Sequence, residues 1–363
     1  MPGKKALRIK KNLQQGVGEL LAGILETEKA EAVFTLRKTS QPRRFCYSLI
    51  SDPELLKQAV PFHPVMPVQG ACALSELTIT SPLDRKVVAL LRPCELRAFT
   101  ENVKQSQGSL ENLTIISCSC EGVIPSGELL KPGTEELAED LKENRREACS
   151  RCREFLPGPL ADMTVVMETD EKTDQTLIYL NSPEAEEMVQ GLDAGEITSV
   201  SPIDELVADT LRERTSAFDR FMKSVPPVSE GLGSLVSMFS SCISCRACRE
   251  ACPICTCVLC DYETRRTIHP PELVRAEAGA RGAFRVPSGT LQFQLGRLNH
   301  IAPLCVSCGQ CSDVCPVDIP VADIFARAAA MVQKTLGYSP GKDLEDEPPM
   351  SAFEENELTE VMD

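Results

Sequence analysis

The chain of 363 residues is longer than one hydrophobic core usually organises, so we expect two domains. Its net charge of −15, its lack of tryptophan and its 4% aromatic content argue against a nucleic-acid binder, which needs a basic face or stacking side chains. No apolar run reaches the about 18 residues of a membrane-spanning helix, and Met1 is followed by basic, helix-like sequence without a secretory signal. We therefore expect a cytoplasmic protein.

The first part of the chain, residues 1–200, alternates between two kinds of pattern. Helical spacing occurs at 16–26 and 134–145, and a turn or two of helix is predicted at 53–58. Short runs rich in β-branched and other apolar residues predict strands at 32–36, 45–50, 86–91, 113–118, 163–167 and 176–180. Strands that alternate with helices predict an α/β domain.

The rest of the chain divides into three segments. Residues 201–235 are predicted to form a helix, ended by Pro226-Pro227, and a linker. Residues 236–340 are organised around cysteines, and a closing helix is predicted at 322–335 with Gly337 as its cap. In the segment 341–363, nine acidic residues and one lysine give a net charge of −8. We expect this acidic tail to be disordered or clamped against a partner.

Cysteine is the decisive residue type, with 18 copies in a chain that shows no sign of export to an oxidising compartment. Dense cysteine in a reducing compartment is typical of metal ligation. We therefore interpret these thiols first as metal ligands rather than as halves of disulfides.

Residues 236–340 contain the same cysteine motif twice, once as Cys242-x2-Cys245-x2-Cys248-x3-Cys252-Pro253. This bacterial ferredoxin spacing wraps three thiolates around one four-iron cluster and sends the fourth to the other cluster. Zinc sites usually pair two separate Cys-x2-Cys knuckles, so zinc is disfavoured. The motifs predict a bacterial-type two-cluster ferredoxin-like α+β domain. The predicted ligands are Cys242, Cys245, Cys248 and Cys315 for cluster one, and Cys305, Cys308, Cys311 and Cys252 for cluster two.

Three further cysteines, Cys255, Cys257 and Cys260, follow the first motif directly. Two clusters do not need them. They are either spare thiols packed near the clusters or ligands to a further centre whose fourth ligand comes from elsewhere. Three ligands do not close a site, so we favour the first interpretation.

The α/β domain has cysteines of its own at the ends of predicted strands. Cys94 lies where a strand is followed by a helix, and Cys118 and Cys120 end the next strand. Strand ends at one edge of an α/β sheet meet in space. Spacing therefore permits a four-thiolate site made of Cys94, one of Cys118 and Cys120, and the pair Cys149-x2-Cys152. A redox disulfide between Cys149 and Cys152 fits the spacing equally well.

At these residues the sequence resembles the beta-subunit family of coenzyme F420 (deazaflavin)-dependent formate dehydrogenase and hydrogenase. The resemblance rests on Pro93-Cys94, on Cys120-Glu121-Gly122 and on the Cys-x2-Cys pair, and it implies that these cysteines hold one four-iron cluster. The implied third set is Cys94, Cys120, Cys149 and Cys152, with Cys118 as the alternative to Cys120. The C-terminal domain is most similar to the formate dehydrogenase branch, in residues 242–260, 305–320 and 335–341.

The sequence departs from this family where its members approach FAD with glycine-rich backbone. Residues 161–176 contain no glycine, and residues 63–70 do not resemble the family's glycine-threonine turn. Only Gly16 and Gly18 remain as candidates. A flavin phosphate needs free backbone amides with no side chain in the way. We therefore predict that the FAD site is lost.

The leading hypothesis is an iron–sulfur electron-transfer subunit with three four-iron clusters and no catalytic residue, since His63, His269 and His300 are isolated in the sequence. The resemblance implies partners such as a formate dehydrogenase or hydrogenase catalytic subunit and a heterodisulfide-reductase-like flavoprotein. One alternative is an FAD-containing reductase subunit that exchanges hydride with a deazaflavin or nicotinamide cofactor. Another is a binding module in which Cys149 and Cys152 form a thiol switch.

Overall fold

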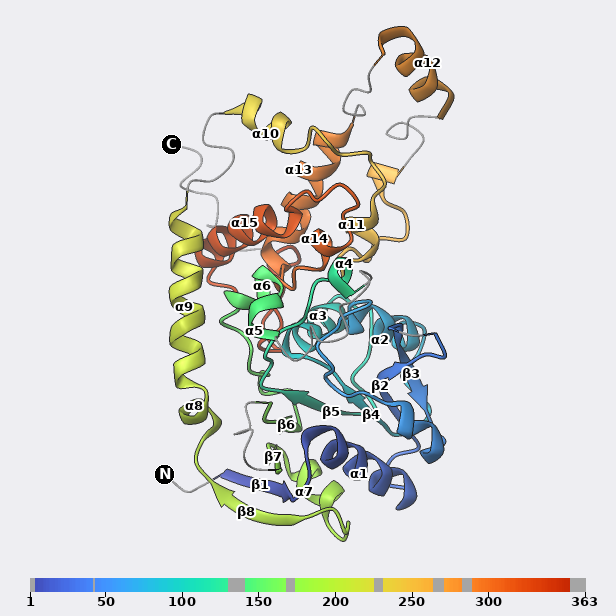
Figure 1. Ribbon diagram of the computed structural model, residues 1–363, viewed down its shortest axis with the longest axis vertical. Helices are drawn as coiled ribbons and strands as arrows, with labels where there is room; N and C mark the ends of the chain where they lie inside the picture. Colours follow the sequence, from blue (N-terminus) through green and yellow to red (C-terminus); the bar gives the residue numbers. More distant parts are fainter. Residues whose placement is uncertain are drawn as a thin grey trace.

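The computed structural model describes residues 4–41, 43–129, 141–167, 174–224, 231–263, 271–282 and 289–352. An α/β body occupies residues 4–200, and a helical cysteine-rich part follows it and packs over one side of the body (Figure 1). The strands are β1 (Lys4–Ile9), β2 (Ala32–Lys38), β3 (Phe45–Ile50), β4 (Val87–Leu90), β5 (Leu113–Cys118), β6 (Met163–Val165), β7 (Thr176–Leu180) and β8 (Glu196–Val200).

The helices of the body lie between the strands. They are α1 (Leu13–Glu26), η1 (Pro53–Gln58), α2 (Gly70–Thr78), α3 (Pro93–Lys104), α4 (Ser126–Leu129), α5 (Leu141–Asn144), α6 (Glu147–Ser150) and α7 (Pro183–Val189). The later helices are α8 (Ile203–Leu206), α9 (Ala208–Lys223), α10 (Leu232–Met238), α11 (Ala247–Glu250), η2 (Asp261–Glu263), α12 (Pro271–Arg281), α13 (Thr290–Ile301), η3 (Ala302–Leu304), α14 (Gln310–Asp313) and α15 (Val321–Leu336). None of the helices in the described ranges is long and apolar enough to cross a membrane.

The eight strands form one mixed sheet in the order β3-β2-β4-β5-β6-β7-β1-β8. Strands β2, β4, β5 and β6 are parallel, and the remaining pairs are antiparallel. Because the parallel strands run the same way, the segments that follow β4 and β5 leave the sheet at one edge. That edge therefore collects the cysteines that follow these strands.

The α/β prediction for residues 1–200 is confirmed, and each predicted strand lies within two residues of an observed one. The segment after Met1 was wrongly read as helix-like. It forms β1, whose hydrogen-bonding partners β7 and β8 lie more than 160 residues away. Most of the helix predicted at 134–145 lies outside the described residues, which show only α5 at its end.

The C-terminal part differs from the expected α+β domain. Within the described residues after Val200 there are helices and turns but no strand. The cysteine motifs occupy turns with left-handed residues, which do not continue a strand. Helix α10 begins inside the predicted linker and extends three residues beyond its predicted end at 235, whereas α15 ends at Gly337 with a left-handed φ of 64°, as expected for a glycine cap.

Each face of the sheet carries a different part of the core. One face packs on α1 and α7, with Val33, Val88 and Ile116 pointing into that cluster. The alternate residues of the same strands, such as Phe34 and Ala89, point into a second cluster that joins α2 and α3 to the cysteine-rich part. The two parts of the molecule therefore share one hydrophobic core on this side.

Helix α9 runs along one side of the molecule from β8 to the cysteine-rich part (Figure 1). Cation–π contacts hold its last turns. The guanidinium groups of Arg151 and Arg327 lie 3.7 Å and 4.0 Å from the ring of Phe221, and that of Arg153 lies 3.8 Å from the ring of Phe218. The helix thus links the loop after Cys149 to α15.

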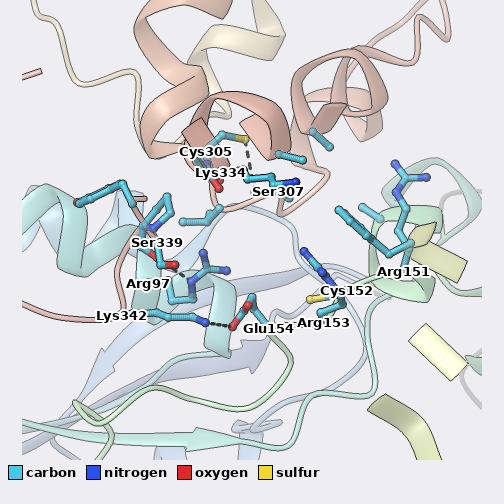
Figure 2. A pocket seen from close by; sticks show the side chains of 18 of the residues that line it. Arg97, Arg151, Cys152, Arg153, Glu154, Cys305, Ser307, Lys334, Ser339 and Lys342 are labelled. Carbon is cyan, nitrogen blue, oxygen red and sulfur yellow. Dashed lines mark hydrogen bonds and ion pairs between the residues drawn. The ribbon is translucent and has the colours of Figure 1, made fainter. Parts of the chain in front are cut away.

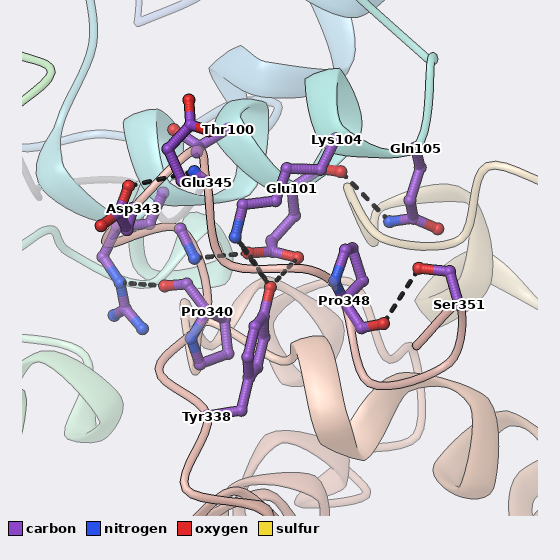
Figure 3. Close-up of polar contacts among 12 residues, drawn as sticks. Thr100, Glu101, Lys104, Gln105, Tyr338, Pro340, Asp343, Glu345, Pro348 and Ser351 are labelled. Atoms are coloured by element: carbon purple, nitrogen blue, oxygen red, sulfur yellow. Dashed lines mark hydrogen bonds and ion pairs between the residues drawn. The ribbon is translucent and has the colours of Figure 1, made fainter. Parts of the chain in front are cut away.

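The start of the acidic tail is docked on the body, not disordered as expected. Glu101 of α3 is fully buried, and its carboxylate accepts hydrogen bonds from the hydroxyl of Tyr338 at 2.8 Å and the amide of Gly341 at 2.5 Å (Figure 3). Lys104 lies 3.3 Å from the same carboxylate. Residues 353–363 lie outside the described residues. One buried acid therefore fastens the segment after α15 to α3.

Gly16 has a packing role where α1 crosses β7. A Cβ atom added at Gly16 would lie 2.5 Å from Oγ1 and 2.8 Å from Cβ of Thr176, whereas one added at Gly18 would meet no atom within 4 Å. Close helix–strand packing therefore accounts for the glycine at position 16 without a flavin.

This pair of glycines provides a matched test. Gly16→Ala is expected to lower the free energy of unfolding by about 1–3 kcal/mol, because the new methyl group overpacks the contact with Thr176. Gly18→Ala should raise it by about 0.5–1 kcal/mol, because alanine is the better helix former in open space. Denaturant unfolding of both variants measures the difference, and equal effects of the two substitutions would contradict this explanation.

Candidate iron–sulfur sites

The two cysteine motifs fold into the same loop. In each motif the third and the fifth residues are left-handed, with φ of 55° and 61° at Ser244 and Arg246, and of 54° and 83° at Ser307 and Gly309. The amides of Ser244 and Ser307 each donate to the first thiol of their motif at 3.4 Å. Such turns point successive N–H groups inward and favour a bound negative group.

Four cysteines of the predicted second set line one cavity. Cys252 of the first motif faces Cys305, Cys308 and Cys311 of the second, in a space otherwise walled by apolar groups such as Phe325. Burial raises the pKa values of the Cys308 and Cys311 thiols, and the neighbouring thiols raise them further. Deprotonating such thiols requires a positive partner, which a cluster of iron ions supplies.

The first set lies closer to the surface. Cys248 of α11 is buried and Cys245 is exposed. Burial raises the pKa of Cys242, and Cys245 and Cys315 lie near enough to add to the shift. The amide of Ile319 donates to the Cys315 thiol at 3.4 Å. The structure thus brings Cys315 of the second motif to the cysteines of the first motif.

The third set forms where β4 and β5 end. Cys94 begins α3, and its pKa is raised by burial and by nearby groups that include Cys120, Cys149 and Cys308. Burial raises the pKa of Cys152 to about 12, and Cys149 and Cys120 are again among its neighbours. The structure therefore gathers Cys94, Cys120, Cys149 and Cys152 at one place on the sheet edge.

The two candidates on β5 have different surroundings. Cys118 is fully buried in the core of the body, and its thiol is hydrogen-bonded to Cys120. That hydrogen bond lowers the pKa of Cys120 against the effect of burial, and Arg92, whose Nη1 lies 3.5 Å from the Cys120 sulfur, lowers it further. Cys120, and not Cys118, is among the groups that raise the pKa values of Cys94, Cys149 and Cys152, so it lies nearer to the other members of the third set.

The extra cysteines do not gather around a further centre. Cys255 lies beside Cys252, and Nε of Arg297 donates to its sulfur at 3.5 Å. Cys257 is exposed, and Cys260 is half-buried. Among the described residues, no group of three or more histidine, cysteine, aspartate or glutamate side chains is placed to hold a single metal ion.

Three buried arginines beside the thiols were missed by the sequence analysis. Arg92 donates to Cys120, Arg146 donates to the carbonyl of Cys308 at 2.7 Å, and Arg297 donates to the carbonyl of Cys248 at 3.0 Å. A four-iron cluster with four thiolates is an anion, so buried positive charges stabilise it. Only Arg92, next to the Pro-Cys pair, had a signal in the sequence.

Neither of the two histidines in the described ranges has its side chain in one of these sites. His63 is mostly buried against Phe45, and its pKa is lowered to about 4 by burial and by the nearby charges of Lys38 and Arg92. His300 lies in α13 near the ring of Tyr262. His269 lies outside the described residues.

Part of the chain is similar to a known iron–sulfur domain, and most of it is similar to known redox subunits. Residues 238–319 match the family model of the 4Fe-4S dicluster domain. The F420-dependent formate dehydrogenase subunit beta of Methanocaldococcus jannaschii is 29% identical over 300 residues, which cover 72% of this chain and 75% of that protein. The F420-dependent formate dehydrogenase 1 subunit beta of Methanococcus maripaludis is 27% identical over 327 residues, with coverage of 73% and 75%.

A search of solved structures found the F420-reducing [NiFe] hydrogenase complex from Methanosarcina barkeri, with a TM-score of 0.47 and 10% identity over 64% of this chain and 95% of that chain. Residues 238–319 are thus similar to a 4Fe-4S dicluster domain. Over about three quarters of its length the chain is similar to beta subunits of F420-dependent formate dehydrogenases.

Proposed function

We propose that this chain carries electrons through three four-iron clusters between other redox proteins and has no catalytic site of its own. Each cluster would be held by one of the cysteine sets described above. The ligands are Cys242, Cys245, Cys248 and Cys315 for cluster one, Cys305, Cys308, Cys311 and Cys252 for cluster two, and Cys94, Cys120, Cys149 and Cys152 for cluster three.

The observation that carries this proposal is the continuity of the three sets. Cys94 of the third set and Cys308 of the second lie near enough for the charge of one to shift the pKa of the other. Cys252 of the second set follows Cys248 of the first at the end of the short helix α11. The sets therefore form a row from the sheet edge to the surface.

The protein side chains in this row prepare the environment of the clusters. Each set has a buried arginine beside it. Arg92 lies beside the third set, Arg146 beside the second and Arg297 beside the first. Such charges favour the reduced, more negative form of a cluster and so raise its reduction potential. The amides of Ser244 and Ser307 act in the same direction.

The two ends of the row suggest how the chain works with partners. Cys245 and Ile243 of the first motif are exposed, so cluster one lies where a second protein could receive electrons. The names of the relatives support a formate dehydrogenase catalytic subunit as one partner. From the sequence resemblance alone we infer a hydrogenase catalytic subunit as the alternative, a heterodisulfide-reductase-like flavoprotein as a second partner, and a cytoplasmic location.

Iron, acid-labile sulfide and released flavin, measured on anaerobically purified protein, test this proposal. Three clusters give about twelve irons per chain, and we expect no flavin. About eight irons would leave Cys149 and Cys152 free and favour a thiol switch. One flavin per chain would overturn the proposal and favour the FAD-containing reductase, which exchanges hydride with a deazaflavin or nicotinamide.

A further inference from the structure

A cavity of about 380 Å³ lies between the α/β body and the cysteine-rich part (Figure 2). Its walls come from α3, from the loop after α6, from the second cysteine motif and from α15 with the segment that follows it. Two members of the cysteine sets, Cys152 of the third set and Cys305 of the second, contribute to its wall. A space of this volume is typical of small-molecule sites.

The cavity is strongly basic in an otherwise acidic protein. Its lining contains five cationic side chains and a single acid, Glu154, while the chain as a whole has a net charge of −15. The cations are Arg97, Arg151, Arg153, Lys334 and Lys342. Lys342 is neutralised by Glu154 at 2.9 Å, and Arg151 by Asp323. Three cations are left without an acidic partner in the described part of the chain.

Arg97 is the least exposed of these three cations. It is only 7% exposed, and its Nε donates to the carbonyl of Pro340 at 2.8 Å. Its two terminal nitrogens make no hydrogen bond to any described residue, and Figure 2 shows the guanidinium group directed into the cavity. A buried guanidinium with free N–H groups lacks the hydrogen bonds that buried charges normally make.

The other two unpaired cations come from other parts of the cavity wall, Arg153 from the loop after α6 and Lys334 from α15. Arg153 is stacked on Phe218 of α9, which fixes its position at the cavity. Lys334 comes from the last turn of α15. Two carbonyls of that turn already accept hydrogen bonds, Gln333 from the amide of Tyr338 at 3.0 Å and Lys334 from the amide of Gly337 at 3.4 Å.

We propose that this cavity binds a diphosphate-bearing small molecule through Arg97, Arg153 and Lys334. A diphosphate group carries about three negative charges, which matches the three unpaired cations, and guanidinium groups bind pairs of phosphate oxygens. The volume leaves room beyond the diphosphate for an attached group such as a nucleoside. Binding at this site does not depend on the number of clusters. The binding experiment therefore tests this proposal separately from the proposed function.

Equilibrium dialysis of the full-length holoprotein with inorganic pyrophosphate, ADP and citrate tests the proposal. We expect saturable binding of pyrophosphate or ADP, stronger than that of citrate. Tighter binding of ADP than of pyrophosphate would show that the attached group is also recognised, and the reverse order would identify the inorganic ion as the ligand. No saturable binding of either phosphate compound, or stronger binding of citrate, would overturn the proposal.

The variant Arg153→Gln/Lys334→Gln removes two of the cations from exposed positions of the fold. We expect it to weaken binding by at least about tenfold, since charge-assisted hydrogen bonds to phosphate are lost. The matched control is Lys4→Gln/Arg212→Gln, which makes the same change in net charge at exposed residues outside the cavity. Equal weakening in both double variants would mean that only overall charge matters, and the site would be rejected.

If the proposed function holds, a bound ligand lies against Cys152 of cluster three and Cys305 of cluster two. Ligand binding should then change the electron paramagnetic resonance spectrum of the reduced clusters in the wild type and not in the double variant. If the ligand binds but the spectrum of the reduced clusters does not change, the ligand has a structural role and no influence on the clusters. An iron content that contradicts the proposed function would leave the dialysis result unaffected.

Discussion

Cys149→Ala is expected to lower the iron content of the holoprotein by about four per chain, with the two ferredoxin-type clusters retained. Cys149 lies in the third set, beside Cys94, Cys120 and Cys152, and it lies outside the motifs at 242–252 and 305–315. Removing one thiolate from a four-cysteine site leaves an iron without a ligand. Iron analysis and the visible absorbance of anaerobically purified protein measure the loss.

Two control variants make the result specific. Cys46→Ala alters a cysteine of β3 whose sulfur lies 3.5 Å from the hydroxyl of Ser48 and which belongs to none of the three sets, so it should leave the iron content unchanged. Cys118→Ala should also keep all the iron, whereas Cys120→Ala should lose as much as Cys149→Ala. If Cys118→Ala loses the iron and Cys120→Ala keeps it, the ligand on β5 has been assigned to the wrong cysteine. Unchanged iron in Cys149→Ala would remove the third cluster.

The cysteine sets could be read from the sequence because their geometry is local. Three thiols two residues apart can wrap a cluster only in a tight loop, whatever the rest of the chain does. In the folded chain Cys252 lines a cavity with Cys305, Cys308 and Cys311, and Cys315 lies near Cys242. The left-handed serines of the loops, Ser244 and Ser307, could not be foreseen, because such backbone normally favours glycine.

Features that depend on distant partners were not visible. The basic segment 4–9 has no strong strand signal, and it becomes β1 because β7 and β8 flank it. Arg146 and Arg297 look like ordinary charged residues in the sequence, and only the folded chain places them beside Cys308 and Cys248. Composition described the tail as disordered, but Glu101, more than 200 residues earlier, holds its first residue.

The choice between a disulfide and a metal ligand at Cys149 and Cys152 illustrates the same limit. Two cysteines separated by two residues are compatible with both chemistries. The structure adds Cys94 and Cys120 to the pair, because the strands β4 and β5 end at the same sheet edge. Four thiols around one place favour a cluster, and this information lies in the topology of the sheet rather than in the pair itself.

Arg146 is expected to control the stability of the junction between the two parts, and Arg146→Ala should lower the free energy of unfolding by about 3–5 kcal/mol. Its guanidinium donates to the carbonyl of Cys308, to Gln310 Oε1 at 3.0 Å and to the carboxylate of Asp313. Arg146 and Asp313 are each only 5% exposed at the side chain. Truncating the arginine leaves a buried carboxylate without its charge partner, which costs more than the loss of a surface pair.

The measurement is the thermal unfolding of the anaerobic holoprotein, followed by cluster absorbance and by circular dichroism. Arg212→Ala provides the control, since Arg212 pairs with Asp209 on the surface, with both side chains mostly exposed, and its removal should cost at most about 1 kcal/mol. Arg146→Met/Asp313→Leu should be less destabilised than the sum of the single variants, because it leaves no unpaired charge. The single variants for this comparison are Arg146→Met and Asp313→Leu. If their losses of unfolding free energy simply add up to that of the double variant, the two side chains do not stabilise the fold as a pair. In that case the contacts of Arg146 with Cys308 and Gln310 hold the junction, and both parts should still unfold together.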